Sequence, residues 1–242
     1  MKGMKIMAAM MAVALVLSGC GNLNNTKKGA IIGTTSGAAA GTGVGALIGH
    51  LVNGKKGTKM GAIIGAAAGT AVGATAGTLI GRKMDKAAAA AAAVAAADVE
   101  KTKDSNGLDA VKVTFDNGIL FATGKYALTS AAQNSLKQFA SNVLNVYTDC
   151  DVSICGFASS DGSDATNLTL SQNRANAVKN YLTGTCSVSG SQIKSSTGYG
   201  EDPQYLVYDA DGKEDRPASR RVEVYLYASE AMIAAANAGT LK

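Results

Sequence analysis

The sequence predicts an α+β fold for its second half, with a βαβαββ-type mixed sheet and helices on one face, preceded by a glycine-rich helical hairpin. Between residues 107 and 229, short alternating segments typical of strands take turns with longer helical patterns. All 4 Phe and 8 Tyr lie after residue 106, whereas residues 29–49 and 57–81 each carry glycine at every fourth position. The second half alone therefore has the large side chains of an ordinary core.

Charge is divided between the same two halves. Residues 1–106 carry 12 Lys/Arg and 4 Asp/Glu, a net charge of +8, and residues 107–242 carry 11 and 14, a net charge of −3. This division argues against a nucleic-acid binder with one broad basic surface. His50 is the only histidine, which excludes most histidine-based metal and triad chemistry. We expect no metal and no cofactor, and a catalytic constellation is absent from the sequence pattern.

The N-terminus has the pattern of an export signal. Two lysines precede an apolar run over residues 6–17, and Leu17-Ser18-Gly19-Cys20 follows. This run is too short to span a bilayer. The tetrad resembles a bacterial lipobox, which implies a signal peptide at 1–19, lipidation of Cys20 and a short tether at 20–28. The residue after the cysteine is not Asp, which favours the outer membrane. The alternative is an ordinary signal peptide with a chance cysteine.

Residues 29–81 predict a helical hairpin. A step of four keeps glycine on one slowly drifting stripe of a helix, where another backbone can approach closely. The segment resembles glycine-zipper domains of bacterial envelope proteins. A flexible linker is the alternative, and it stays open whether the hairpin spans, lies on or packs near the membrane, or forms homo-oligomers. The two glycine series are Gly29, Gly33, Gly37, Gly41, Gly45 and Gly49, then Gly57, Gly61, Gly65, Gly69, Gly73, Gly77 and Gly81.

The next segment, residues 82–106, predicts a semi-rigid helical stalk. Its alanine runs have high helix propensity, and no stripe of large apolar side chains is evident. The domain at 107–229 follows, and residues 230–242 are expected to be a C-terminal tail. Within the domain we expect strands at 111–115, 152–157, 193–199 and 221–227, and helices at 130–147 and 165–182.

Several motifs in this domain are similar to the peptidoglycan-binding C-terminal domain of outer membrane protein A. They are Phe115-Asp116, Gly156, the helix pattern Asn167-x-x-Leu170-Ser171-x-x-Arg174-Ala175, Gly198-Tyr199-Gly200-Glu201 and Arg220-Arg221-Val222-Glu223. The resemblance covers about residues 107–229. It implies a lipid-anchored outer-membrane protein whose C-terminal domain lies in the periplasm and binds the diaminopimelate of the peptidoglycan stem. The expected partners are thus peptidoglycan and the lipid bilayer, with no nucleic acid.

The helix motif supplies the candidate ligand-binding residues. Its spacing places Asn167, Ser171 and Arg174 near one another, towards the helix N-terminus. Arginine binds carboxylates in bidentate fashion, and the resemblance implies that Arg174 meets the diaminopimelate carboxylate. The Asp that the family uses for the ligand ammonium is replaced by Ser159. Asp161 or Asp164 are the alternatives from a shifted loop. The plain alternatives are an Arg174 that is solvated or forms a salt bridge on the helix, and an Asp161 that merely shapes a loop.

The last strand adds weaker candidates. We expect Arg220 near the ligand and Arg221 on the other face, because neighbouring strand residues alternate. Arg216 and Asn117 are candidates by position alone. The acidic stretch 202–215 contains Asp-Ala-Asp-Gly-Lys, which is better explained by a solvated loop than by a calcium site.

The remaining cysteines predict one disulfide. An oxidising envelope permits disulfides. The helix at 165–182 is long enough to return beside the strand at 152–157, which would bring Cys186 to Cys150. Cys155 would face the other side of the sheet and stay free.

From the export signal, the glycine-rich segment and the C-terminal motifs together, we expect a tether between the outer membrane and the cell wall. The alternative is a membrane-inserting or oligomer-forming envelope protein in which the glycine zipper is the active part and peptidoglycan binding is weak or altered.

Overall fold

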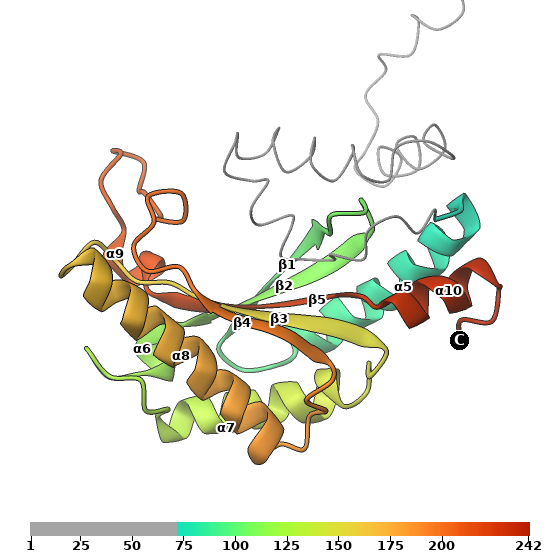
Figure 1. The fold of residues 1–242 in the computed structure, drawn as a ribbon, viewed down its shortest axis with the longest axis horizontal. Coiled ribbons are helices and arrows are strands. Elements are labelled where there is room, and N and C mark those ends of the chain that lie inside the picture. Colours follow the sequence, from blue (N-terminus) through green and yellow to red (C-terminus); the bar gives the residue numbers. More distant parts are fainter. Residues whose placement is uncertain (1–71) are drawn as a thin grey trace, which may run out of the picture. The chain divides into compact units, whose positions relative to one another are not determined.

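A computed structural model describes residues 72–242 of the chain (Figure 1). The predicted signal peptide, Cys20 and most of the glycine-rich hairpin lie outside the described residues. None of the helices within 72–242 is both long enough and apolar enough to cross a membrane. The elements in chain order are α5 (Ala74–Ala92), β1 (Ala97–Lys103), β2 (Asp109–Asp116), α6 (Asn117–Leu120), α7 (Ser130–Phe139), the π-helical turn η2 (Ala140–Leu144), β3 (Cys150–Gly156), α8 (Asp164–Gly184), β4 (Ile193–Gly198), α9 (Arg216–Ser219), β5 (Arg221–Ala228) and α10 (Glu230–Asn237).

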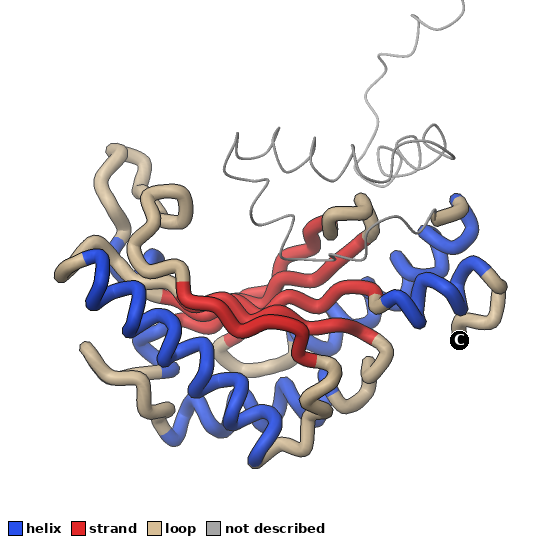
Figure 2. Tube along the Cα trace, viewed as in Figure 1, coloured by secondary structure: helices blue, strands red, loops and turns tan. Residues whose placement is uncertain are grey.

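The five strands form one mixed sheet in the order β1-β2-β5-β3-β4 (Figure 2). β3 and β4 are parallel, and every other neighbouring pair is antiparallel. The parallel pair is joined by α8, since a parallel connection needs a crossover that a helix commonly provides. The predicted α+β mixed sheet is confirmed.

One face of this sheet carries the main core. Val113 of β2, Val224 of β5 and Ile154 of β3 stand in one row across three strands and are fully buried. The core that they enter also contains side chains from α5, α7, α8 and α10. A smaller cluster, which includes Cys155, Tyr225 and Tyr227, occupies the other face. The predicted placement of the helices on one face therefore holds.

The prediction of a detached stalk at 82–106 is wrong. Residues 74–92 do form a helix, but Ile80 and Met84 of α5 are at most 1% exposed and belong to the main core. Residues 97–103 form the edge strand β1, paired with β2. The exposed side chains of β1 are charged, and the half-buried ones between them are small or β-branched. Beside the alanine runs, this pattern was not recognised as a strand. The folded domain thus begins before residue 107.

Two further boundaries differ from expectation. The helix expected at 130–147 has regular α-helical geometry only to Phe139 and continues as η2. The expected tail at 230–242 contains α10, whose Ser229 hydroxyl caps the helix by accepting from Met232 N–H at 3.1 Å. Met232 and Ile233 are buried in the main core, so this short helix is held by apolar contacts.

Cys150, Cys155 and Cys186 are free thiols, so the predicted Cys150–Cys186 disulfide is not formed in this structure. Cys150 and Cys186 do pack on the same core, and Cys155 lies on the opposite face. Burial raises the pKa of the Cys150 thiol to about 12, with a smaller contribution from the charge of Asp149. Disulfide formation needs a thiolate, which this burial disfavours.

Candidate functional site

The candidate site lies where the loop after β3 meets the beginnings of α8 and β5. α8 starts with Ser163 as its N-cap, whose hydroxyl accepts from Thr166 N–H, and Asp164 stands in the first turn. β5 starts directly after the short helix α9, which Asp215 caps by accepting from Ala218 N–H at 3.1 Å. Loop residues 157–163 are thus held between two helix starts.

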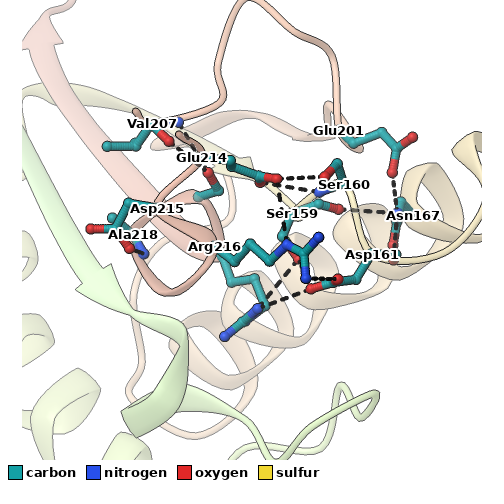
Figure 3. Close-up of polar contacts among 12 residues, drawn as sticks. Ser159, Ser160, Asp161, Asn167, Glu201, Val207, Glu214, Asp215, Arg216 and Ala218 are labelled. Carbon is teal, nitrogen blue, oxygen red and sulfur yellow. Dashed lines mark hydrogen bonds and ion pairs between the residues drawn. The ribbon is translucent and has the colours of Figure 1, made fainter. Parts of the chain in front are cut away.

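Asn167 organises this loop from inside the protein (Figure 3). Its side-chain amide donates to the Ser159 carbonyl at 3.1 Å and to the Asp161 carbonyl at 2.9 Å, and it contacts the Glu201 carboxylate. Asn167 is only 4% exposed. Its role here is to fix the backbone of residues 159–161, although the sequence suggested a ligand contact.

Ser171 is also engaged within the fold. Its hydroxyl accepts from Gly200 N–H at 2.8 Å and donates to the Leu168 carbonyl at 2.9 Å. The side chain is fully buried. Ser171 therefore joins α8 to the segment after β4. Its hydroxyl is buried and already hydrogen-bonded within the fold.

Arg174 has a different environment. It is 1% exposed, its Nε donates to the Lys125 carbonyl at 3.0 Å, and its guanidinium lies 5.3 Å from the centre of the Phe121 ring. Among the described residues, Nη1 has no hydrogen-bond partner and no carboxylate pairs with the guanidinium. Burial lowers the pKa of Arg174 to about 10, and the charge of Arg220 adds to the effect. The plain alternative of a salt-bridged or solvated Arg174 does not describe this side chain.

Asp161 supplies the carboxylate at this loop. Its Oδ2 accepts from the Ser159 hydroxyl at 3.1 Å and lies 3.4 Å from Nη1 of Arg220, while its Oδ1 lies 2.9 Å from Nη1 of Arg216. Figure 3 shows the Asp161 carboxylate facing Arg216. The other alternative, Asp164, acts on Glu201 instead, since this neighbouring carboxyl is the largest cause that raises the pKa of Glu201. The two loop acids therefore serve different partners.

The segment before α9 closes over the same loop. Glu214 accepts from Ser160 N–H at 3.1 Å and from the Ser160 hydroxyl at 2.5 Å, and it lies 3.8 Å from Nε of Arg216. Figure 3 shows these contacts linking the two segments. No sequence pattern predicts this contact between Glu214 and Ser160, because Glu214 lies in an acidic stretch that resembles any solvated loop.

Arg221 points to the opposite face of the sheet, as its alternation with Arg220 predicts. Its guanidinium stacks over the Phe157 ring at 4.2 Å, and its Nε donates to Glu223 at 2.7 Å. Glu223 also accepts from the Tyr225 hydroxyl at 2.6 Å. This buried ion pair lies beside the smaller cluster, which includes Phe157 and Tyr225, and is separate from Arg174. Asn117 begins α6, and its side chain is outside what the structure describes.

Comparisons with known proteins give two family matches for this chain. Residues 120–220 match the model of the OmpA family, and residues 1–85 match the model of YMGG-like Gly-zippers. The first match includes Ser159, Asp161, Arg174 and Arg220, whereas Asn117 precedes it. The chain thus contains one segment similar to the OmpA family and one similar to YMGG-like Gly-zippers, so the predicted resemblance is confirmed.

Two curated relatives are similar to about half of the chain. Outer membrane porin F of Pseudomonas aeruginosa is 32% identical over 124 residues, which are 50% of this chain and 34% of that protein. Outer membrane protein P5 of Haemophilus influenzae is 34% identical over 118 residues, which are 46% of this chain and 32% of that protein. This chain spans about a third of the length of these relatives. A solved structure of a MotB-like protein from Desulfovibrio vulgaris is similar with a TM-score of 0.48 and 20% identity, covering 64% of this chain and 92% of that one.

Proposed function

We propose that this chain is a cell-envelope lipoprotein that binds peptidoglycan non-covalently and tethers the outer membrane to the cell wall. Its OmpA-family domain would lie in the periplasm and bind the diaminopimelate-type peptide stem. Cys20 would carry the lipid anchor, and the domain would act in binding rather than in catalysis. The outer-membrane relatives and the family match support this general class.

The observation that carries the proposal is the unpaired Arg174. Burying a guanidinium without a carboxylate is costly, and proteins commonly pair such groups. Here the charge has only the Lys125 carbonyl and the Phe121 ring, and Nη1 is unsatisfied among the described residues. A ligand carboxylate would satisfy it with a bidentate, charge-assisted contact. Because Arg174 is buried, the segment around Lys125 would have to move aside when the ligand enters.

The test is binding of the purified full chain to cell-wall sacculi. Arg174→Ala should weaken binding by about 1.5–3 kcal/mol, since a hydrogen bond to a charged group is lost. Lys137→Ala is the matched control, because it removes a positive charge from an exposed position on α7. Binding of folded Arg174→Ala at the wild-type level would contradict the assignment of the site.

Lipid anchoring needs its own experiment. Cys20→Ala should abolish incorporation of labelled fatty acid, because the thioether of the proposed lipid forms on this thiol. Several acyl chains on one residue give stable anchoring, at roughly 0.8 kcal/mol for each buried methylene. The variant should therefore be recovered in the soluble periplasmic fraction. Normal acyl labelling of Cys20→Ala would show that the lipobox assignment is mistaken.

The second candidate function rests on the glycine-zipper match at residues 1–85. In this second function, the glycine zipper inserts into a membrane or forms oligomers, and binding to peptidoglycan is secondary. Replacing Gly37, Gly41 and Gly45 by Leu should then abolish cross-linked oligomers or membrane insertion, because bulky side chains prevent close helix packing. A tether would instead keep its sacculus binding in this variant, so the two functions separate in one pair of assays.

A further inference from the structure

Around the candidate site, a buried arginine lacks an acidic partner, whereas the carboxylates of the loop have partners. Arg174 has no acidic partner among residues 72–242 whose side chains are described, whereas the nearby carboxylates are engaged. Both oxygens of Asp161 are in use, one with Arg216 and the other with Arg220 and Ser159. Both oxygens of Glu214 contact Ser160. The loop around Ser159 thus offers the unmatched positive charge of Arg174, whereas the carboxylates of Asp161 and Glu214 beside it are already engaged.

Position 159 is the place where an acid would change this balance. Ser159 is 3% exposed, and its hydroxyl donates its single proton to Asp161. Nη1 of Arg220 approaches the same hydroxyl oxygen at 3.4 Å. An ammonium group brought to this point would meet a neutral oxygen beside a guanidinium. It would also compete with Arg216 and Arg220 for Asp161, and like charges repel one another.

Resting on the proposed function, we propose that the site recognises a stem carboxylate without recognising the ammonium group on the same carbon. Arg174, reinforced by Arg220, binds the anion, and Asp161 serves to hold the arginines and the loop. The substrate class is therefore any peptide stem with a free carboxylate at this position. A stem whose neighbouring amino group is acylated, as in a cross-link, belongs to this class, and a stem whose carboxylate is amidated does not.

The test compares three synthetic stem peptides by calorimetric titration into the full chain in detergent. The first carries unmodified diaminopimelate, the second is acetylated on the distal amino group, and the third is amidated on the distal carboxylate. Acetylation should change the affinity by less than about twofold, and amidation should lower it by about tenfold or more, since charge-assisted bonds are the strong ones. A tenfold loss on acetylation would overturn the proposal. Failure of all three peptides to bind would overturn the proposed function itself.

Two variants distinguish the roles of the loop residues. Asp161→Asn should tighten binding of the unmodified and acetylated peptides equally, because it frees the arginines from a competing carboxylate. If Asp161 instead binds the ligand ammonium, this variant will weaken the unmodified peptide alone, which would refute the proposal. Ser159→Asp, if it folds by circular dichroism, should create a preference of about tenfold for the free amine, since it adds the missing charge. An unchanged ratio in folded Ser159→Asp would count against the assignment of position 159.

Discussion

Gly156 and Gly198 lie opposite each other in the parallel strands β3 and β4, and neither has room for a Cβ atom. A Cβ on Gly156 would lie 2.3 Å from the Ser171 carbonyl oxygen, and one on Gly198 would lie 2.2 Å from the Gln172 nitrogen. Both obstacles are backbone atoms of α8. The glycine pair therefore sets how closely α8 approaches the sheet, and with it the position of Arg174 one turn further along.

The first prediction follows from this close approach. Gly198→Ala should lower the free energy of unfolding by about 1–3 kcal/mol or more, because overpacking forces the backbone of α8 to shift. Urea denaturation of the wild type and the variant would measure the difference. Gly184→Ala is the matched control, since no atom lies within 4 Å of a Cβ built there. Equal losses in the two variants would contradict the packing argument.

The second prediction concerns Asp104, which closes the turn between β1 and β2. One carboxylate oxygen accepts from the backbone of Asn106 and Leu108, and the other is buried without a hydrogen-bond partner among the described residues. Burial is the largest cause that raises the pKa of Asp104 from 3.8 to about 6. Since the folded state favours the protonated acid, its stability should fall as the pH rises from about 4 to about 6.

The variant Asp104→Asn tests whether the stability of the folded state falls as the pH rises. The shift corresponds to roughly 3 kcal/mol as an upper value, and the variant should remove most of this loss between pH 4 and pH 7. Thermal or urea unfolding across this range would show it as a flatter stability profile. Asp211→Asn, at an exposed loop position, should leave the profile of the wild type. A decrease in stability at pH 7 in Asp104→Asn would show that the charged form is favoured in the folded state.

The sequence predicted most of the sheet because its strands and helices have strong periodic patterns. β2, β3, β4, β5 and α8 all lie within a few residues of expectation. β1 was missed because its seven residues carry four charged side chains beside an alanine-rich helix. An edge strand needs only one buried side, and the partner that buries it is distant in sequence. The role of α5 was missed for the same reason, since small alanines become core residues only once β2 lies against them.

The candidate site shows a similar limit. The helix spacing correctly grouped Asn167, Ser171 and Arg174, but it could not tell which side chains the fold itself would engage. Asn167 and Ser171 are satisfied by loop atoms, whereas Arg174 Nη1 is not satisfied by the described residues. The contact between Glu214 and Ser160 joins residues 54 positions apart in the sequence, and no local pattern encodes it.

The third prediction concerns the buried ion pair on the opposite face. The side chains of Arg221 and Glu223 are 13% and 4% exposed and 2.7 Å apart. Arg221→Met should lower the free energy of unfolding by about 3–5 kcal/mol, because it leaves a buried carboxylate uncompensated. The double variant Arg221→Met/Glu223→Gln should recover much of this loss, because glutamine is neutral and can still accept from Tyr225. Urea unfolding of both variants measures the coupling. No recovery in the double variant would attribute the loss to packing on Phe157 instead.

The last prediction sets stability against binding at Arg174. This side chain is 1% exposed, and burial lowers its pKa to about 10, so the charged form is held in the folded domain at a cost. Arg174→Met keeps a long apolar side chain beside Phe121 and removes the buried charge. Replacing buried charges by well-packed apolar residues is often neutral or stabilising, by about 1–4 kcal/mol. Loss of the contacts to Lys125 and Phe121 offsets part of this gain, so the variant should unfold at a urea concentration equal to or above that of the wild type.

Binding of Arg174→Met to sacculi should be lost in the same preparation, because a thioether cannot hold a carboxylate. Under the proposed function, the cost of this residue to the fold is explained by its role in binding the ligand. A variant that is strongly destabilised, or one that still binds, would show that Arg174 serves the fold rather than the ligand.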